Sequence, residues 1–161
     1  MFKIVLYQPE IPANTGNIGR LCVGCGGELH IIKPMRFLLS DKYLKRAGLD
    51  YWKLLKLFVH SDLSEIQESQ SPETIYYCTT KAAKQYTQPI YKPGDAFVFG
   101  PESRGLPEDL LQQNAAQTIT IPMSAEIRSL NLSNSVAIVL YEALRQIKWN
   151  GESSPDRRII C

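Results

Sequence analysis

The stretch Arg128-Ser129-Leu130-Asn131-Leu132-Ser133-Asn134-Ser135 places a tight polar turn directly before an apolar helical pattern. The apolar residues after it recur with the three-and-four spacing of one helix face, at Val136, Leu140, Ala143, Leu144 and Ile147. The spacing predicts a helix over residues 133–149. Hydroxyl groups, an amide and unpaired helix N–H groups would then lie together, where they can bind a polar or anionic ligand. A plain helix N-cap has the same composition, so both interpretations stay open for this stretch alone.

Short β-rich runs alternate with helical patterns along the rest of the chain. Strands are predicted at 1–8, 29–32, 56–60, 74–79, 96–100 and 118–121, and further helices at 17–25, 43–47, 61–70 and 107–113. This alternation predicts an α/β fold with a mostly parallel sheet flanked by helices. We expect a single domain over residues 1–149, followed by a mobile polar tail at 150–161.

The composition is that of an ordinary globular domain. The 161 residues are 44% hydrophobic and 21% charged, and the formal net charge of +2 implies no particular partner. A chain of this length buries roughly 70% of its unfolded surface without a metal or a disulfide. The N-terminal apolar run is far shorter than the about 20 residues of a membrane span, and it is too short for a signal peptide. We therefore expect a cytoplasmic protein with no membrane contact.

The cysteines and histidines do not form a metal-binding pattern. Cys22 and Cys25 make one C-x-x-C pair, but no second Cys or His pair lies at metal spacing, and His30 and His60 stand alone. We expect neither a metal site nor redox chemistry.

Two more polar segments follow predicted strands. Residues 8–20 contain two prolines that stiffen the segment, asparagines expected to cap the next helix, and Arg20, which can clamp a phosphate. In residues 99–105, Gly100 permits close backbone approach to a flat ligand, and Glu102 is expected to face the site. Backbone groups between Ile121 and the 129–131 turn could read an adenine. Ligands collect beyond the carboxyl ends of strands in open α/β sheets, so the three segments predict one shared site.

Common enzyme motifs fail on spacing. The Gly100-x-x-Ser103-x-Gly105 run has one residue too many for a nucleophile elbow. Gly24-x-Gly26 lacks the third glycine of a dinucleotide fingerprint, and no Gly-Lys-Ser/Thr phosphate loop occurs. A nucleotide-binding domain with hydrolase activity is therefore disfavoured.

Taken together, the three segments resemble the SPOUT class of RNA 2′-O-methyltransferases, specifically its small YibK-like, TrmL-type tRNA enzymes. The resembling motifs are Ile4-Val5-Leu6-Tyr7-x-Pro9-Glu10-Ile11-Pro12-x-Asn14-Thr15-Gly16-Asn17-Ile18-x-Arg20, then Phe99-Gly100-Pro101-Glu102-x-Arg104-Gly105, then Ile121-Pro122-Met123 with residues 128–135. The resemblance covers nearly the whole chain. It implies methyl transfer from S-adenosyl-L-methionine to the ribose 2′-hydroxyl of the wobble nucleotide, cytidine or uridine, in the tRNA anticodon loop. It further implies a homodimer and a C-terminal trefoil knot, which no general topology rule would suggest.

The resemblance also assigns roles to single residues. It implies that the cofactor lies against the backbone at Cys78, Gly100, Ile121 and Ser129. Cys78 replaces an aliphatic residue, which a backbone contact tolerates. Arg36 replaces a glycine after the second strand and adds a charge that could touch RNA.

Arg20 is expected to act at the ribose. Its guanidinium stays protonated at physiological pH, so a free arginine is a poor base. Two interpretations remain: the RNA phosphate and the site help Arg20 to accept the 2′-proton, or Arg20 only orients the hydroxyl and stabilises the developing alkoxide. We favour the second interpretation. The other expected catalytic groups are Glu102, as a partner of Arg20 or Arg104, and Asn131, as a ligand of the ribose or the methionine end.

Several residues are expected to contact the substrate or a second subunit. Asn14 and Asn17 would shape the first loop, and Tyr141 either projects toward a partner subunit or is an interface or core tyrosine. Residues 33–56 carry seven Lys or Arg against two Asp, including Arg36, Lys45 and Arg46, which is enough for a phosphate-contacting patch. Tyr43, Tyr51 and Trp52 could stack on a splayed base, although a solvated charged face with a buried aromatic anchor gives the same pattern. A non-catalytic RNA-binding protein that keeps a cofactor pocket is the alternative function.

Overall fold

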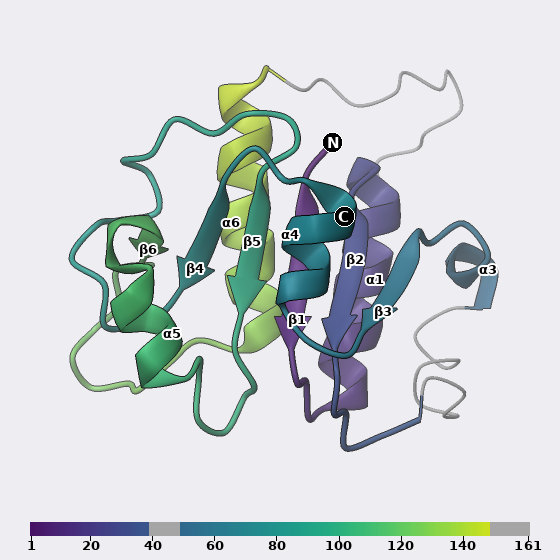
Figure 1. The fold of residues 1–161 in the computed structure, drawn as a ribbon, viewed down its shortest axis with the longest axis horizontal. Coiled ribbons are helices and arrows are strands. Elements are labelled where there is room, and N and C mark those ends of the chain that lie inside the picture. The colour runs from purple at the N-terminus through teal and green to yellow at the C-terminus, as the bar shows by residue number, and fades with distance from the viewer. Residues whose placement is uncertain (39–48, 149–161) are drawn as a thin grey trace.

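The chain folds around a six-stranded sheet (Figure 1), seen in a computed structural model that describes residues 1–38 and 49–148. The sheet has the order β3-β2-β1-β5-β4-β6, and every neighbouring pair is parallel. The strands are β1 (Lys3–Tyr7), β2 (Glu28–Ile32), β3 (Leu57–His60), β4 (Ile75–Cys78), β5 (Ala96–Phe99) and β6 (Thr118–Ile119). The prediction of a mostly parallel α/β sheet is confirmed.

Helices cover both faces of this sheet (Figure 1). They are α1 (Pro12–Cys25), α3 (Leu49–Trp52), α4 (Ser64–Gln70), α5 (Glu108–Gln113), a 3₁₀ turn (Ala115–Gln117) and α6 (Leu132–Gln146). Helices α1 and α6 pack side by side on one face, and α4 and α5 cover the other.

The alternation of side chains along the central strands builds two cores. Ile4 and Leu6 of β1 pack toward α1 and α6, whereas Val5 between them packs toward α4 and α5. All three side chains are fully buried, and each such burial stabilises the fold by about 1.5–3 kcal/mol. Because both faces are buried, the strand reads as a continuous apolar run in the sequence.

Two helices begin at positions that differ from the predictions. Helix α1 begins at Pro12, five residues before the predicted start, and its N-cap is Ile11, whose side chain makes no capping hydrogen bond. The expectation that asparagines cap this helix is wrong, because Asn14 and Asn17 lie inside it. Helix α4 begins at Ser64 and not at residue 61, since the Asp62 carboxylate accepts the Ser64 N–H at 2.8 Å and holds a turn before it.

Other boundaries shift by a few residues. Strand β6 ends at Ile119, two residues early, and α6 begins at Leu132, one residue early. The predicted helix at 43–47 and the predicted tail at 150–161 lie outside the described residues.

The two histidines meet in the interior, so the expectation that they stand alone is wrong. His30 on β2 and His60 at the end of β3 place Nδ1 and Nε2 3.0 Å apart, and the Phe58 ring stacks on His30. Burial, followed by the charges of His60 and Lys3, lowers the pKa of His30 to about 4. His30 is therefore neutral at physiological pH.

Within residues 1–38 and 49–148, no group of three or more His, Cys, Asp or Glu side chains could hold a metal ion. Burial raises the pKa of the Cys22 thiol and raises that of Cys25 to about 11, so neither is a thiolate near neutrality. None of the described helices is long and apolar enough to cross a membrane.

Candidate active site

A cavity of about 550 Å³ lies beyond the carboxyl ends of β4, β5 and β6 and in front of α6. It is lined by residues from all three predicted segments. The predicted site residues that line it are Asn14, Cys78, Gly100, Glu102, Ile121, Ser129 and Asn131. The three segments therefore converge on one place, as the rule for open parallel sheets predicts.

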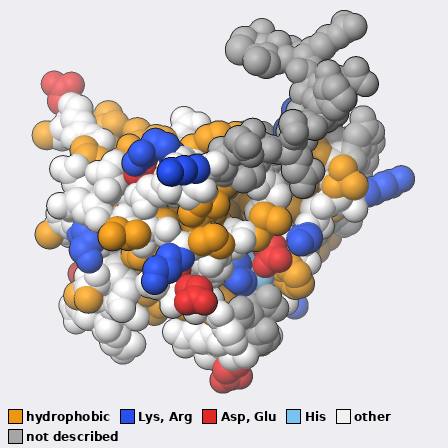
Figure 2. Space-filling model, turned by 90° about the horizontal axis from the view of Figure 1, so that it is seen from above, with side chains coloured by type: hydrophobic (Ala, Val, Ile, Leu, Met, Phe, Trp, Pro, Cys, Tyr) orange, Lys and Arg blue, Asp and Glu red, His pale blue; other side chains and the backbone are white. Residues whose placement is uncertain are grey.

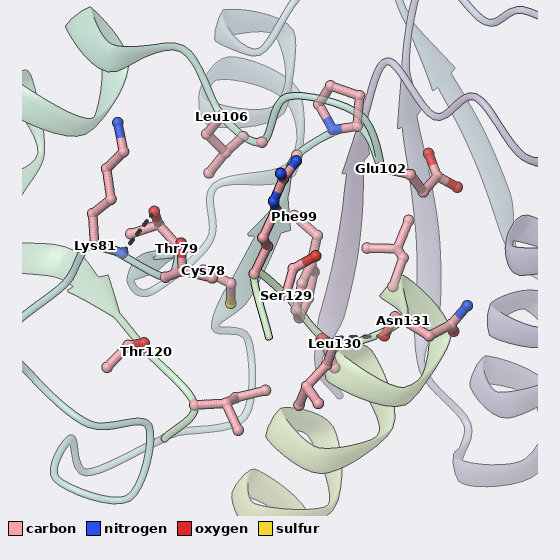
Figure 3. A pocket seen from close by; sticks show the side chains of 18 of the residues that line it. Cys78, Thr79, Lys81, Phe99, Glu102, Leu106, Thr120, Ser129, Leu130 and Asn131 are labelled. Carbon is pink, nitrogen blue, oxygen red and sulfur yellow. Dashed lines mark hydrogen bonds between the residues drawn. The ribbon is translucent and has the colours of Figure 1, made fainter. Parts of the chain in front are cut away.

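The cavity has chemically distinct sides (Figure 3). Thr79, Lys81 and Thr120 lie on one side, Ser129 and Phe99 lie near the centre, and Glu102 and Asn131 lie on the side nearest α1. Buried Phe99 and Leu106 give the wall an apolar surface. A flat apolar group and a hydroxyl-bearing group can thus be held in the same cavity.

Gly100 is required because the chain passes very close to itself. A Cβ at this position would lie 2.3 Å from the backbone carbonyl carbon of Gly105 and 2.3 Å from the Leu106 nitrogen. The expected reason was close approach to a ligand, but the space that a side chain would fill is taken by the protein's own loop. Gly105 closes that loop with φ of 72°, a conformation that glycine adopts at little cost.

Glu102 caps helix α1 from a distant part of the sequence. Its carboxylate accepts hydrogen bonds from the backbone N–H groups of Glu10 at 2.9 Å and Ile11 at 3.2 Å. It also accepts one from the Asn14 amide at 2.9 Å. These contacts correct the expectation that Glu102 pairs with Arg20 or Arg104, because Arg104 donates instead to the Gln8 side chain at 2.6 Å. The negative charge is favourable here because it lies at the N-terminal end of α1, where the helix dipole is positive.

Asn14 joins this cap to the start of α6. Its carbonyl oxygen accepts a hydrogen bond from the Asn131 amide at 3.0 Å, while its own amide donates to Glu102. The Asn131 carbonyl oxygen in turn accepts the N–H groups of Ser133 at 2.9 Å and Asn134 at 3.4 Å, which makes Asn131 the N-cap of α6. A continuous chain of hydrogen bonds therefore fixes three remote segments to one another.

Glu10 makes the reciprocal contact to the second segment. Its carboxylate accepts the Ser103 backbone N–H at 3.0 Å and forms an ion pair with Arg36 at 3.3 Å. Hydrogen bonding from Ser103, helped by the charges of Arg36 and Arg104, lowers the pKa of Glu10. Arg36 is thus exposed but held close to the site by Glu10.

The remaining predicted residues that the structure describes, apart from Arg36, lie on α1 and α6 and do not line the cavity. Arg20 and Asn17 are exposed on α1, and Tyr141 on α6 is 53% exposed, which excludes a core position within this chain. Lys45 and Arg46 lie outside the described residues.

Helix α3 packs on α1 beside Arg20. The Tyr51 hydroxyl donates to the Gly16 carbonyl oxygen at 2.9 Å, and Trp52 lies against Gly19, where a Cβ would be 3.4 Å from the indole ring. Burial raises the pKa of Tyr51, and the nearby positive charge of Arg20 opposes that shift. These partly buried rings thus serve as anchors on α1.

The cavity also contains residues that sequence reasoning missed. Thr79, Thr80 and Lys81 line it directly after β4, and Lys81 closes one side through an ion pair with Glu108 at 2.5 Å. This hydroxyl-rich run after a strand is visible in the sequence. The rule applied to the other segments, that ligands bind beyond strand ends, would have assigned it to the site.

Comparison with known proteins identifies the family of this chain. The model of the SpoU rRNA Methylase family matches residues 1–141, which includes all the cavity residues named above. The chain belongs to this family. The chain is 48% identical over 152 residues to the tRNA (cytidine(34)-2'-O)-methyltransferase of Escherichia coli strain K12, and the match covers 94% of this chain and 97% of the relative. It is also 48% identical to the protein of the same name from Methylovorus glucosotrophus, covering 94% and 99%.

Solved structures of similar proteins have the same fold. One comes from work on the 2-OH methylation of C/U34 on tRNA; it has a TM-score of 0.86 and 42% identity, and the match covers 92% of this chain and 97% of that chain. The methyltransferase AviRb from Streptomyces viridochromogenes, solved with AdoMet, has a TM-score of 0.80 at 20% identity, a likeness of fold alone.

Proposed function

We propose that this chain transfers a methyl group from S-adenosyl-L-methionine to the ribose 2′-hydroxyl of the wobble nucleotide, cytidine or uridine, in tRNA anticodons. The observation that carries the proposal is the convergence of three remote segments on one cavity, tied together by Glu102, Asn14 and Asn131. The relatives from Escherichia coli and Methylovorus glucosotrophus, which match nearly the full length of the chain, are named for this activity.

The chemistry of the cavity fits the cofactor. Its volume of about 550 Å³ lies in the usual range for a small-molecule site. Apolar Phe99 and Leu106 suit a purine face, and the hydroxyls of Thr79 and Ser129 suit a ribose or an amino acid end. We assign Cys78, Gly100, Ile121 and Ser129 as the residues whose backbone holds it. When bound, the cofactor supplies an electrophilic methyl group.

Arg20 is proposed to act on the ribose and not on the cofactor, because it lies outside the cavity wall on the exposed face of α1. Its protonated guanidinium can bind a phosphate and donate to the 2′-oxygen as negative charge develops there. In the transfer, the bond between that oxygen and the methyl carbon would form as the bond between the methyl carbon and the cofactor's sulfur breaks, which leaves the sulfur as a neutral thioether. The 2′-proton would go to solvent or to the RNA phosphate. Glu102 and Asn131 are positioning residues in this scheme, since their side chains accept hydrogen bonds from backbone N–H groups at the starts of α1 and α6.

A homodimer is the proposed assembly. Helix α6 presents a partly exposed apolar stripe at Ala137, Ile138 and Tyr141, spaced as one helix face. A second copy could cover this stripe and supply more surface for tRNA.

The resemblance also implies a trefoil knot. We propose that the knot forms where the chain after β6 passes the connection between β4 and β5. The backbone hydrogen bonds of Thr120 with Lys84 and Tyr86 support this location.

The proposed RNA contacts lie near the motif segments. Arg20, Arg36 and Arg104 are exposed there. Lys45 and Arg46, which lie outside the described residues, are proposed from the sequence as further substrate-binding residues. At the opposite edge, seen in Figure 2, the described Lys and Arg side chains are spread among hydrophobic and neutral ones without gathering into one patch. That edge is therefore not the proposed interface.

The test is methyl transfer by the purified protein. Incubation with labelled S-adenosyl-L-methionine and tRNA lacking the wobble modification should yield 2′-O-methylated cytidine or uridine after digestion to nucleosides. Binding of tRNA and cofactor without any transfer would favour the non-catalytic alternative.

A further inference from the structure

A second cavity, of about 460 Å³, lies at the carboxyl ends of β1 and β2 and directly after β3. The arrowheads of β1 and β2 in Figure 1 point to this edge. Its walls come from the turn before α4 and from α5, and every residue that lines it is described. The volume is that of a small-molecule site, and the position is where parallel sheets bind ligands. The cofactor assignment does not use it.

The two cavities share a wall. Leu106 lines the cofactor cavity, and the next residue, Pro107, lines the second cavity. Consecutive Cα atoms are about 3.8 Å apart, so a single thickness of chain separates them here. A ligand in the second cavity therefore lies beside the cofactor site and not on a remote surface.

Gln8 has a strained backbone conformation and contacts the loop that leads to this wall. Its φ is 52°, in the left-handed region that residues other than glycine seldom adopt. The Gln8 N–H donates to Ile32 O at 3.0 Å, and its side-chain oxygen accepts from Arg104 at 2.6 Å. Gln8 itself lines the second cavity. The strained residue thus connects the second cavity to the loop that also forms the cofactor cavity.

The lining of the second cavity combines a flat apolar surface with hydrogen-bond acceptors. Tyr7 and Leu110 provide the apolar surface, and the carboxylate of Asp109 and the amide of Gln113 provide acceptors. Asp62 also lines the cavity, but its Oδ1 already accepts hydrogen bonds from the N–H and the hydroxyl of Ser64. Two carboxylates against one cation, Lys33, make the lining net negative, which disfavours phosphate, and a carboxylate accepts a hydrogen bond from the amino group of a base. An unstacked nucleobase matches this lining, because it has a face to stack on tyrosine and an edge that donates.

We propose that the second cavity binds one nucleobase of the RNA substrate, a neighbour of the methylated nucleotide that carries an exocyclic amino group. The sugar-phosphate backbone of that nucleotide is left to two exposed cations, Lys33, which is itself part of the lining, and Arg104. This inference rests on the proposed RNA substrate but not on methyl transfer itself. It gives the chain a means of selecting the sequence around its target.

The test uses two adjacent glutamines of α5 as a matched pair. Gln113 lines the second cavity and Gln112 does not, and both are exposed. Gln113→Trp should fill the cavity, whereas Gln112→Trp adds the same bulk outside it. The ligands are anticodon stem-loops in which each nucleotide flanking the acceptor is replaced, one at a time, by an abasic site. Binding is measured by fluorescence anisotropy, and Asp109→Asn serves as a second, less bulky variant.

For the parental chain and for Gln112→Trp, we expect one abasic site to weaken binding by about fivefold to 100-fold, the usual effect of losing a stacked base. For Gln113→Trp, intact RNA should bind as weakly as that abasic RNA, with no further loss when the two changes are combined. Replacing the sensitive base by its deaminated form should weaken binding to the parental chain but not to Asp109→Asn.

Equal binding by the Gln113→Trp and Gln112→Trp variants would overturn the proposal, as would equal binding of all the abasic RNAs. An unchanged affinity for the deaminated base would refute the amino-group contact. These readouts are affinities, so a chain that binds RNA in this way but transfers no methyl group would refute the proposed function alone.

Discussion

Replacing Glu102 by alanine tests whether this residue is a helix cap or a catalytic group. The variant leaves the N–H groups of Glu10 and Ile11 and the amide of Asn14 without the carboxylate that accepts them. Hydrogen bonds to a charged group contribute about 1.5–3 kcal/mol each when buried, and loss of an N-cap costs about 0.5–2 kcal/mol. Glu102 is only partly buried, so water will replace some of these contacts. We expect the free energy of unfolding to fall by about 2–4 kcal/mol.

The assay is urea and thermal unfolding followed by tryptophan fluorescence. For a chain of this size the expected loss corresponds to a fall in Tm of about 4–16 °C. Glu68→Ala, an exposed change on α4, is the matched control and should shift the stability by no more than about 0.5 kcal/mol. A double-mutant cycle with Asn14→Ala should show a coupling of about 0.5–3 kcal/mol, because the two side chains are in direct contact. If Glu102→Ala unfolds like Glu68→Ala but loses methyl transfer, Glu102 acts in the chemistry and the cap interpretation is wrong.

Three further substitutions test other parts of the site and the core. Arg20→Ala should bind S-adenosyl-L-methionine like the parental chain but lose roughly 100-fold to 1,000-fold in single-turnover methyl transfer, with poor rescue by Arg20→Lys; a parental rate at saturating tRNA would reduce Arg20 to a binding residue. Gly100→Ala should weaken cofactor binding in calorimetry because its Cβ displaces the 105–106 backbone, whereas Gly24→Ala, whose Cβ meets nothing within 4 Å, should not. His30 has a pKa of about 4 in the fold and 6.5 ordinarily, so the unfolded chain binds its proton more tightly and the free energy of unfolding should fall between pH 6.5 and pH 4. That loss should reach about 3 kcal/mol and should flatten in His30→Phe, and equal pH slopes for the two chains would refute the cause.

The sheet could be predicted because its strands are short apolar runs separated by polar turns. Both faces of β1 are buried, and the run at residues 1–8 indicated this strand without any long-range information. The start of α1 could not be predicted in the same way. Its cap is Glu102, 91 residues from Ile11, and a local search for capping residues found only the asparagines of the helix itself.

The convergence of the site was predictable from strand ends, but the roles of its polar residues were not. Glu102 and Asn131 are of residue types that also act in catalysis, and only the three-dimensional contacts show that they bind helix termini. The same holds for His30 and His60, which are 30 residues apart and meet because β2 and β3 are neighbours. Spacing along the chain carries no information about such contacts.

The central claim, that the acceptor is the ribose hydroxyl of the wobble nucleotide, is tested most directly by removing that single oxygen. An anticodon stem-loop with a 2′-deoxy nucleotide at the wobble position should accept no methyl group from the parental chain. A stem-loop with the 2′-deoxy nucleotide at the next position should still be methylated. Methylation of the first RNA at the rate of an unmodified stem-loop would contradict the account.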